Sequence, residues 1–315
     1  MRFRRAQHTL AMHQASAFNV AGLHVPFKRM QVYPVTGTIG AEVEGVDLSQ
    51  PLPPDVVNEL RAAFLRHGVL FFRHQHGLSP QAHLDFCRRF GPIQRHPIVQ
   101  GMPGYPDIIQ IVKEPGSPTR FGEEWHSDHS FMSSPPMGSV LVARELPEYG
   151  NDTLFNCMQS AYDGLSNGLQ ALLGQLRSVH TSRLAFSHSD RQRQANFNGT
   201  APMQYKAGQD NTAVHPVVTV HPETGKRVLF VNPMFTPCFE GMTVDESKPI
   251  LDMLFAKAHR PEFQCRFRWS PGSVAFWDNR RLQHLAINDN LGSRRVMHRI
   301  TIDGGGSDQG QSRMI

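Results

Sequence analysis

The sequence has few cysteines, no long apolar run and no continuous tract of basic residues. Among its 315 residues are four cysteines, and none of them forms a Cys-x-x-Cys pair. This argues against a zinc cluster or a redox motif and favours free thiols in a reducing compartment. No apolar stretch approaches the length that spans a bilayer. We therefore expect a cytoplasmic protein that does not act at a membrane.

Basic residues exceed acidic ones without being gathered in one segment. The formal net charge is +5, but the arginines are spread in short clusters such as Arg88-Arg89 and Arg294-Arg295. Binding of nucleic acid needs a continuous basic face, and a nucleotide-binding α/β fold needs a glycine-rich phosphate loop between a strand and a helix. The sequence shows neither pattern. Its excess of arginine instead indicates small anionic molecules as partners.

Acidic residues are missing from the amino-terminal part, where the first acid is Glu42. We interpret residues 1–30 as a basic, non-catalytic extension and residues 31–304 as a single domain. Within this domain, residues 187–213 are polar and poor in apolar side chains, which is typical of a lid-like surface loop. The glycine-rich and polar residues 305–315 are expected to form a flexible tail.

Short alternating stretches separated by turn residues predict the fold class. They include residues 138–144 and 179–186 and three final strands at residues 264–269, 273–277 and 295–302. Helices are expected at residues 56–67 with Asp55 as cap, after Ser79-Pro80, and at residues 245–258. Many short strands with few helices predict a mainly β domain with flanking helices, either a β-sandwich or a jelly roll.

The stretch Trp125-His126-Ser127-Asp128 carries the first chemical signature. Residues 125–132 have the pattern of an extended segment, in which alternation places His126 and Asp128 on one face and His129 on the other. An imidazole and a carboxylate together are two thirds of the two-His-one-carboxylate set that holds non-haem Fe(II). In a chain with 17 histidines such a short pattern also arises by chance, so a third ligand must come from elsewhere.

A second set of polar residues lies in the last fifty positions. His284 follows a strand that stops at Asp278-Asn279, and alternation places Arg295 and Arg299 on one face of the next strand. In an isolated strand, two such arginines more often form a solvent-exposed face. If His284 is the third ligand, however, both lie near the metal, where buried guanidinium groups need anions and hold carboxylates through two hydrogen bonds. The other histidines, among them His129, His180, His215, His221 and His298, are interpreted as packing or surface residues.

Several motifs follow one another in a characteristic order between about Val32 and Gly304. They are Trp125-His126-Ser127-Asp128 with Pro135-Pro136, Asn151-Asp152-Thr153, Phe276-Trp277-Asp278-Asn279, Gln283-His284 and Arg294-Arg295-Val296-Met297-His298-Arg299. Together they resemble the taurine dioxygenase family of Fe(II)- and 2-oxoglutarate-dependent oxygenases. The resemblance implies a double-stranded β-helix, which is a jelly roll, with a metal at its open mouth.

The resemblance also implies roles for individual residues. Fe(II) is expected at His126, Asp128 and His284, and the distal carboxylate of 2-oxoglutarate at Arg295 and Thr153. The implied reaction consumes O2, hydroxylates a small organic acid and releases succinate and CO2. Substrate contacts are implied for four further residues, namely His96, Arg299, Phe186 and Phe235.

Three positions depart from the family pattern. Val99 stands where taurine-binding members have a tyrosine, and Gly122 stands where they have an asparagine, so two polar contacts to taurine are missing. Asn151 replaces the usual glycine of its turn, which the left-handed backbone region tolerates. We expect a larger or more apolar acid than taurine, such as a sulfonate, an alkyl sulfate or an aryloxyalkanoate, and a homo-oligomeric enzyme.

The same residues are also compatible with two other functions. One is a cupin-like hydrolase or isomerase with zinc at the three ligands, which gives Arg295 and Thr153 no role. The other is a non-enzymatic anion-binding protein on a jelly-roll scaffold, which leaves the three ligands without a purpose.

Overall fold

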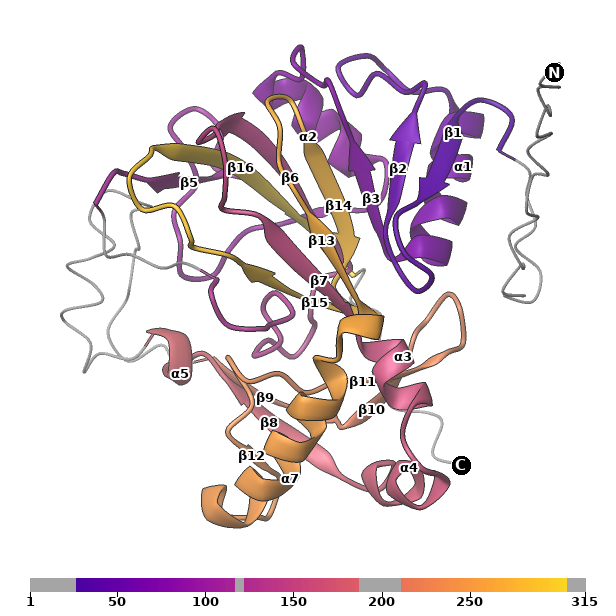
Figure 1. Cartoon of the computed structure of the whole chain (residues 1–315), viewed down its shortest axis with the longest axis vertical. Coiled ribbons are helices and arrows are strands. Elements are labelled where there is room, and N and C mark those ends of the chain that lie inside the picture. Colours follow the sequence, from indigo (N-terminus) through magenta and orange to yellow (C-terminus); the bar gives the residue numbers. More distant parts are fainter. Residues whose placement is uncertain (1–26, 117–121, 187–210, 305–315) are drawn as a thin grey trace, which may run out of the picture.

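The computed structural model describes residues 27–116, 122–186 and 211–304, apart from the side chain of Phe186. It shows a β-rich body joined to a smaller unit of short strands and helices (Figure 1). The predicted extension lies outside the described residues except for residues 27–30, and the predicted lid-like loop except for residues 211–213. The predicted tail, residues 305–315, lies wholly outside them.

Within the described residues, eight strands form the main sheet, in the order β1-β2-β3-β14-β6-β16-β4 with β5 beside β16. All neighbouring strands are antiparallel except β2 and β3. The strands predicted near residues 138–144 and 295–302 are confirmed as β6 and β16. The bounds are β1 Gln31–Pro34, β2 Ala41–Glu44, β3 Val69–Phe72, β4 Ile93–Gln94, β5 Ile109–Lys113, β6 Gly138–Glu145, β14 Val274–Asp278 and β16 Arg295–Ile302.

A second sheet, in the order β13-β7-β15, faces the main sheet across an apolar layer. In this layer the rings of Phe71 and Phe267, one from each sheet, stack with centroids 4.0 Å apart. The sequence pattern did not indicate β15, because Gln283 and His284 interrupt its apolar alternation; pairing with β7 makes it a strand. The bounds are β7 Thr153–Cys157, β13 Gln264–Phe267 and β15 Leu282–Ala286.

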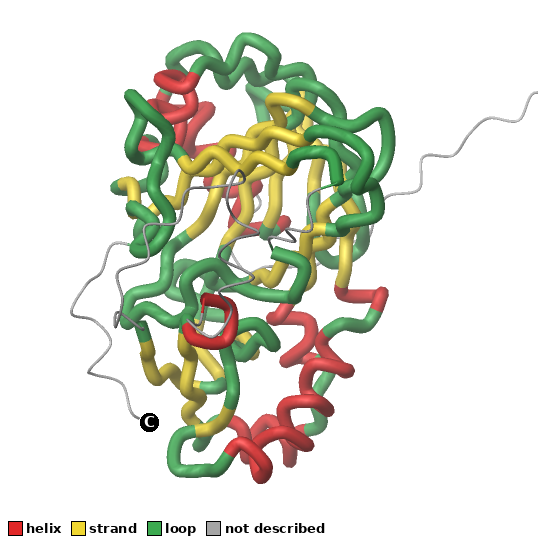
Figure 2. The backbone as a smooth tube through the Cα atoms, turned by 90° about the vertical axis from the view of Figure 1, so that its left-hand side faces the viewer, coloured by secondary structure: helices red, strands yellow, loops and turns green. Residues whose placement is uncertain are grey.

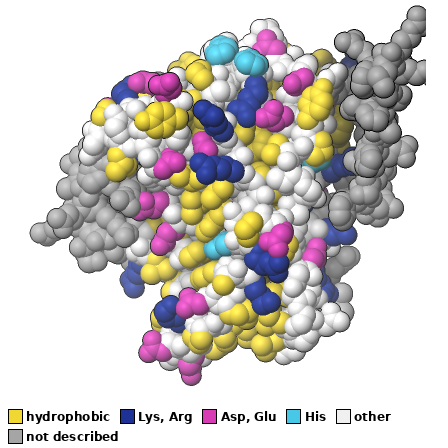
Figure 3. All heavy atoms as spheres, viewed as in Figure 1, with side chains coloured by type: hydrophobic (Ala, Val, Ile, Leu, Met, Phe, Trp, Pro, Cys, Tyr) yellow, Lys and Arg dark blue, Asp and Glu magenta, His cyan; other side chains and the backbone are white. Residues whose placement is uncertain are grey.

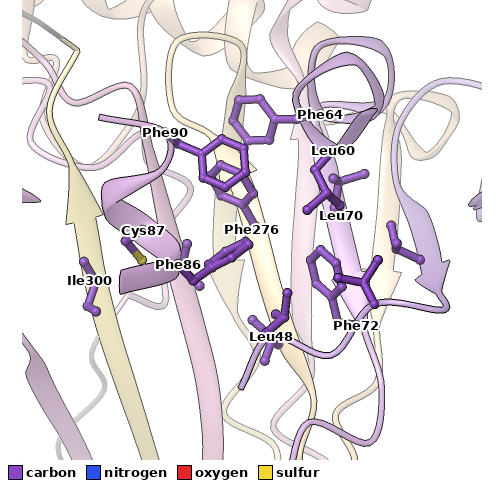
Figure 4. Packing of buried hydrophobic residues seen from close by; sticks show 14 of the residues in the cluster. Leu48, Leu60, Phe64, Leu70, Phe72, Phe86, Cys87, Phe90, Phe276 and Ile300 are labelled. Atoms are coloured by element: carbon purple, nitrogen blue, oxygen red, sulfur yellow. The ribbon is translucent and has the colours of Figure 1, made fainter. Parts of the chain in front are cut away.

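Two helices, α1 (Pro54–His67) and α2 (Pro80–Arg88), cover the other face of the main sheet. Successive side chains of β14 point to opposite faces of the main sheet. Phe276 points to the helices, and Trp277 points to the layer between the sheets. Phe276 stacks on Phe64 with centroids 4.1 Å apart (Figure 4). Full burial of one such side chain contributes roughly 1.5–3 kcal/mol, so this cluster fixes the helices firmly on the sheet.

The starts of the two helices differ in how well the sequence predicted them. Ser79 caps α2 as predicted, because its side chain accepts a hydrogen bond from the N–H of Ala82. The prediction that Asp55 caps α1 was wrong. The cap position is Pro53 and the helix begins at Pro54, which has no N–H to leave unsatisfied, so Asp55 lies in the first turn.

The smaller unit packs short strands against helices (Figure 2). Its sheet has the order β12-β8-β9, beside the hairpin of β10 and β11. The predicted extended stretch 179–186 was wrong in its second half, because the hydroxyl of Thr181 accepts a hydrogen bond from the N–H of Arg183 and a helical turn follows. The bounds are α3 Met158–Asp163, α4 Asn167–Leu173, β8 Arg177–Thr181, α5 Arg183–Phe186, β9 Thr212–Pro216, β10 Val218–Val220, β11 Arg227–Leu229, β12 Cys238–Phe239, α7 Val244–Ala258 and η1 Pro261–Phe263.

Membrane-spanning helices, cysteines and surface charge were each addressed by the sequence predictions. In the described part of the chain, no helix combines the length and the apolar character needed to cross a membrane. All four cysteines lie in this part and are free thiols, as predicted. On the face shown in Figure 3, lysine and arginine side chains are interspersed with acidic ones.

A buried polar network joins the smaller unit to the main body. His180 on β8 has no exposed surface, and its two ring nitrogens lie 3.0 Å from the hydroxyl groups of Ser178 and Ser130. Burial and, to a smaller extent, the neighbouring His215 lower the pKa of His180 to about 3. Burial also lowers the pKa values of His67 and His298, each to about 4.

We therefore predict that the fold loses stability on acidification. The unfolded chain protonates His180 below about pH 6.5, whereas the folded chain does so only near pH 3. The stabilisation is thus complete above pH 6.5 and is lost as the pH falls towards 3. Urea unfolding should give a free energy lower by on the order of 1 kcal/mol at about pH 5.5 than at about pH 7.5. His180→Asn should reduce this difference, and equal free energies at both pH values would contradict the prediction.

Candidate metal centre

The two histidines predicted as ligands face each other across two extended backbone segments. His284 lies in the middle of β15, and His126 is its antiparallel partner in an isolated bridge. The N–H of His126 donates to the carbonyl of His284 at 3.1 Å, and the N–H of His284 donates back at 2.8 Å. The predicted extended segment 125–132 is therefore right at His126, but it is wrong beyond this point because a turn begins at Asp128.

The turn brings the carboxylate of Asp128 back towards the two imidazoles. Its Oδ1 lies 3.8 Å from Nε2 of His126 and 3.9 Å from Nε2 of His284. In the described part of the chain, these three buried side chains form the one group of His, Cys, Asp or Glu that could hold a metal ion, with ligand atoms within 4.8 Å of one another. Such spacing fits an ion at about 2.1 Å from each atom.

Both imidazoles are available in the neutral form that a metal ion requires. Nδ1 of His126 lies 2.8 Å from the carbonyl oxygen of Glu124, so it donates its proton there and Nε2 keeps a lone pair. Nδ1 of His284 is buried and has no hydrogen-bond partner among the described residues. Burial lowers the pKa of His126 and holds that of His284 well below its ordinary value. Two neutral imidazoles and one carboxylate fit a divalent transition metal.

Three polar side chains hold the carboxylate of Asp128. Ser139 donates to Oδ2 at 2.7 Å, and Nδ2 of Asn279 lies 3.5 Å from the same oxygen. Arg299 donates to Oδ1 at 2.9 Å. Although burial alone would raise the pKa of Asp128, the guanidinium of Arg299 holds it well below its ordinary value. The carboxylate is therefore a fixed anion.

Thr153 and Arg295, the residues predicted to hold the co-substrate, both contact Trp269. The indole N–H of Trp269 donates to the hydroxyl of Thr153 at 3.0 Å, and the guanidinium carbon of Arg295 lies 6.0 Å from the ring centre. Nε of Arg295 is buried and has no hydrogen-bond partner among the described residues. Burial lowers the pKa of Arg295 to about 10, so it is charged at neutral pH. A partly exposed cation whose buried Nε–H is unused favours an anion at this place.

Two of the predicted substrate residues lie directly beside the metal group. Arg299 is hydrogen-bonded to Asp128, as described above, and the ring of Phe235 lies edge-to-face against His126 with centroids 6.0 Å apart. Phe186 ends α5, and its side chain is outside the described residues.

His96, the fourth predicted substrate residue, packs on His129, the neighbour of Asp128. The two rings meet edge-to-face with centroids 4.3 Å apart. Nδ1 of His96 accepts hydrogen bonds from the N–H groups of Ile98 and Val99, both at 3.0 Å, so the neutral ring carries its proton on Nε2. The prediction that His129 faces away from this region was wrong, because its φ of 48° belongs to the turn and not to a strand.

Backbone conformation explains two of the departures from the family pattern. Gly122 has a φ of 71°, and a Cβ atom there would lie 3.4 Å from Cε1 of His126. This distance is an ordinary contact, so the left-handed backbone, and not a lack of space, favours glycine at this position. Asn151 has a φ of 55°, as expected for a residue that replaces glycine in the left-handed region.

Ser139, Asn279 and Trp269 are residues of the site that the sequence patterns did not indicate. Ser139 is a hydroxyl in a strand whose other residues from Gly138 to Ala143 are apolar, and a buried hydroxyl needs a partner. This signal was available, but it does not name the partner. Asn279 stands in one of the motifs that carry the resemblance, but the motif gave it no role, and Trp269 gave no signal, because both contacts depend on packing between distant segments.

Comparison with known proteins agrees with this geometry. The family model described as "Taurine catabolism dioxygenase TauD, TfdA family" matches residues 31–301. An alkylsulfatase from Acinetobacter baylyi is 33% identical over 279 residues, which cover 89% of this chain and 86% of the relative. An alpha-ketoglutarate-dependent sulfate ester dioxygenase from Pseudomonas putida is 31% identical over 278 residues, with 87% and 90% covered.

Solved structures give the same result. The crystal structure of a taurine dioxygenase from Burkholderia xenovorans superposes with a TM-score of 0.73 at 38% identity, covering 88% of this chain and 90% of that one. The resemblance inferred from the motifs is thereby confirmed. The chain belongs to the TauD/TfdA family of 2-oxoglutarate-dependent dioxygenases.

Proposed function

We propose that this dioxygenase uses Fe(II) and O2 to hydroxylate a small organic acid of the alkyl sulfate or sulfonate type, with succinate and CO2 as co-products. The observation that carries the proposal is the buried group of His126, Asp128 and His284, whose donor set is that of non-haem Fe(II) sites. Bound there, Fe(II) supplies the O2 chemistry that oxidises the keto acid and the substrate. The two facing sheets support the inference that the fold is a double-stranded β-helix.

Arg295 and Thr153 suit the distal carboxylate of 2-oxoglutarate. The planar guanidinium of arginine matches the two oxygens of a carboxylate, and Nε of Arg295 has no partner among the described residues. Thr153 accepts its hydrogen bond from Trp269, so the hydrogen of its own hydroxyl remains available for donation. One charged donor and one neutral donor would thus meet a single anion, in surroundings that strengthen both hydrogen bonds.

His96 and Arg299 suit the anionic group of the substrate. In its neutral form His96 offers a donor at Nε2, and Arg299 adds positive charge beside Asp128. Donors of both kinds fit a head group with several acceptor oxygens, such as a sulfate or sulfonate. Val99 is buried against Ile109 and has no polar side-chain atom for the amine of taurine, while the ring of Phe235 supplies apolar surface beside the metal group.

A substrate screen tests the proposal. Purified protein with Fe(II) and 2-oxoglutarate is given an alkyl sulfate, an alkanesulfonate of equal length, an aryloxyalkanoate and taurine, and succinate is measured. We expect the alkyl sulfate and the alkanesulfonate to exceed taurine. Highest release with taurine would overturn the substrate assignment, and no release with any acid would overturn the proposal.

A second measurement separates the dioxygenase from the cupin-like alternative. Anaerobic addition of Fe(II) and 2-oxoglutarate should give a weak visible charge-transfer band, which a zinc-dependent hydrolase at the same ligands would not give. Hydrolysis of the alkyl sulfate by zinc-loaded protein without 2-oxoglutarate would favour that alternative.

A further inference from the structure

His259, which follows the last residue of α7, contacts the residues directly before both ligand histidines. Its imidazole stacks on the ring of Trp125, with centroids 5.0 Å apart and planes inclined by 18°. Its Nε2 lies 3.0 Å from Oε1 of Gln283. Trp125 precedes His126, and Gln283 precedes His284. One partly exposed side chain outside the metal centre therefore contacts both backbone segments that form it.

The bridge between His126 and His284 explains how one side chain can reach both segments. Successive side chains of extended backbone point to opposite faces, so Trp125 and Gln283 point away from the metal group. Each lies one position before a member of a directly opposed pair, which makes them diagonal neighbours at roughly 7–8 Å. An imidazole inserted from the outer face can contact both.

The hydrogen bond between His259 and Gln283 has a fixed direction. Nε2 of Gln283 donates to the carbonyl of Val231 at 2.5 Å, so Oε1 of the same amide is the acceptor that faces His259. Nε2 of His259 accordingly carries the proton. Gln283 is 1% exposed, and a buried acceptor that loses its donor destabilises the fold.

The backbone of His259 is anchored as firmly as its side chain. Its N–H donates to the carbonyl of Phe255 at 2.9 Å, and its own carbonyl accepts a hydrogen bond from Nε2 of Gln264 at 2.6 Å. The imidazole thus extends from a fixed point between the end of α7 and the start of β13. In Figure 1, α7 lies below the second sheet, with its carboxyl-terminal end directed towards that sheet.

We propose that His259 is a positioning residue of the metal centre, which fixes the relative orientation of the segments that carry His126 and His284. The inference rests on the proposed metal site. The segment of His126 belongs to neither large sheet and meets β15 in an isolated bridge. Hydrogen bonds from the N–H of Ala286 to Gly122 and from the hydroxyl of Ser127 to Leu282 also join it to β15, and His259 adds contacts on its outer face. A partner hydrogen-bonded directly to a ligand typically changes metal affinity by roughly 10- to 100-fold, and His259, which contacts the residues before the ligands, should lie at the lower end of this range.

Three substitutions separate the two contacts of His259. His259→Phe keeps a ring for Trp125 and removes the donor, His259→Gln keeps a donor and removes the ring, and His259→Ala removes both. Lys257→Ala, in the last turn of the same helix and exposed, is the matched control. The measurements are anaerobic Fe(II) affinity, the visible spectrum of the Co(II)-substituted protein, which reports ligand geometry, and the free energy of unfolding without metal.

We expect His259→Ala to lower Fe(II) affinity by roughly 10-fold, the lower end of the range for direct partners of a ligand, and to change the Co(II) spectrum. His259→Phe and His259→Gln should give smaller losses, and Lys257→Ala none. Wild-type affinity and spectrum in His259→Ala would overturn the positioning role. If His259→Ala does not fold, wild-type Fe(II) affinity and a wild-type Co(II) spectrum in both His259→Phe and His259→Gln would overturn the positioning role.

The substitution His126→Ala distinguishes between two outcomes, in which either the positioning role alone or the proposed metal site as well is wrong. If it loses metal while His259→Ala does not, the site stands and only the positioning role is wrong. If His126→Ala itself keeps wild-type affinity, the metal site is elsewhere and both proposals fail.

Discussion

Replacing His126 by alanine should abolish Fe(II) binding and the turnover of 2-oxoglutarate together. The substitution removes one of three protein donors from a buried group whose ligand atoms lie within 4.8 Å of one another. Loss of an outer contact to a ligand already costs roughly 10- to 100-fold in affinity, so loss of the ligand itself should cost at least about 100-fold. The measurements are bound iron after desalting and the rate of succinate release.

The matching control is His76→Ala, which removes an exposed histidine of the same chain and should leave both quantities unchanged. Asp128→Asn gives a second, independent test. It preserves the shape of the side chain but removes the negative charge that Arg299 and the metal share. Stoichiometric iron in both His126→Ala and Asp128→Asn would contradict the assignment of the metal centre.

Replacing Arg295 by methionine should raise the KM for 2-oxoglutarate by about 30-fold or more. Loss of one partner from a buried, hydrogen-bonded charge pair costs roughly 2–5 kcal/mol, and the lower figure corresponds to about 30-fold. Because the distal carboxylate does not react, the proposed contact with Arg295 would be the same before and during the reaction. The loss should therefore fall mainly on KM, with a smaller change in kcat.

Arg294→Ala is the neighbouring control for this prediction. Arg294 is exposed and forms ion pairs with Glu114 and Glu145, contacts that are worth little at a surface. Its removal should leave the KM for 2-oxoglutarate within about twofold of wild type, as befits an effect below 1 kcal/mol. Equal effects of the two substitutions would show that general positive charge, and not the position of Arg295, attracts the co-substrate.

The sequence predicted best where a local pattern decides the structure. Ser79-Pro80 begins a helix because a hydroxyl cap and a proline at the first position act within one turn. The paired motifs around His126 and His284 were sufficient to expect that these residues meet, although 17 histidines offered many other pairs. The first signal lies within one turn of the helix it predicts, whereas the second comes from the family resemblance of motifs that lie far apart in the sequence.

The sequence failed where a distant segment decides the structure. Residues 282–286 form β15 only because β7 lies beside them, and no periodicity within five residues could show this. The turn at Asp128 likewise interrupts a segment whose pattern favours a strand. His129 and Ser139 contact residues that folding brings close to them. Their roles therefore depend on the arrangement of the strands, which the local sequence pattern does not show.

The bridge between His126 and His284 joins residues that are separated by half of the chain. An ion bound by both would act as a reversible cross-link, because it closes a loop of this length only in the folded state. Closing such a loop costs the unfolded chain roughly 5 kcal/mol of conformational entropy, which the folded chain has already lost before the ion arrives. Metal loading should therefore raise the melting temperature, and the segments that carry His126 and His284 should separate more readily under force or heat when the ion has been removed by a chelator.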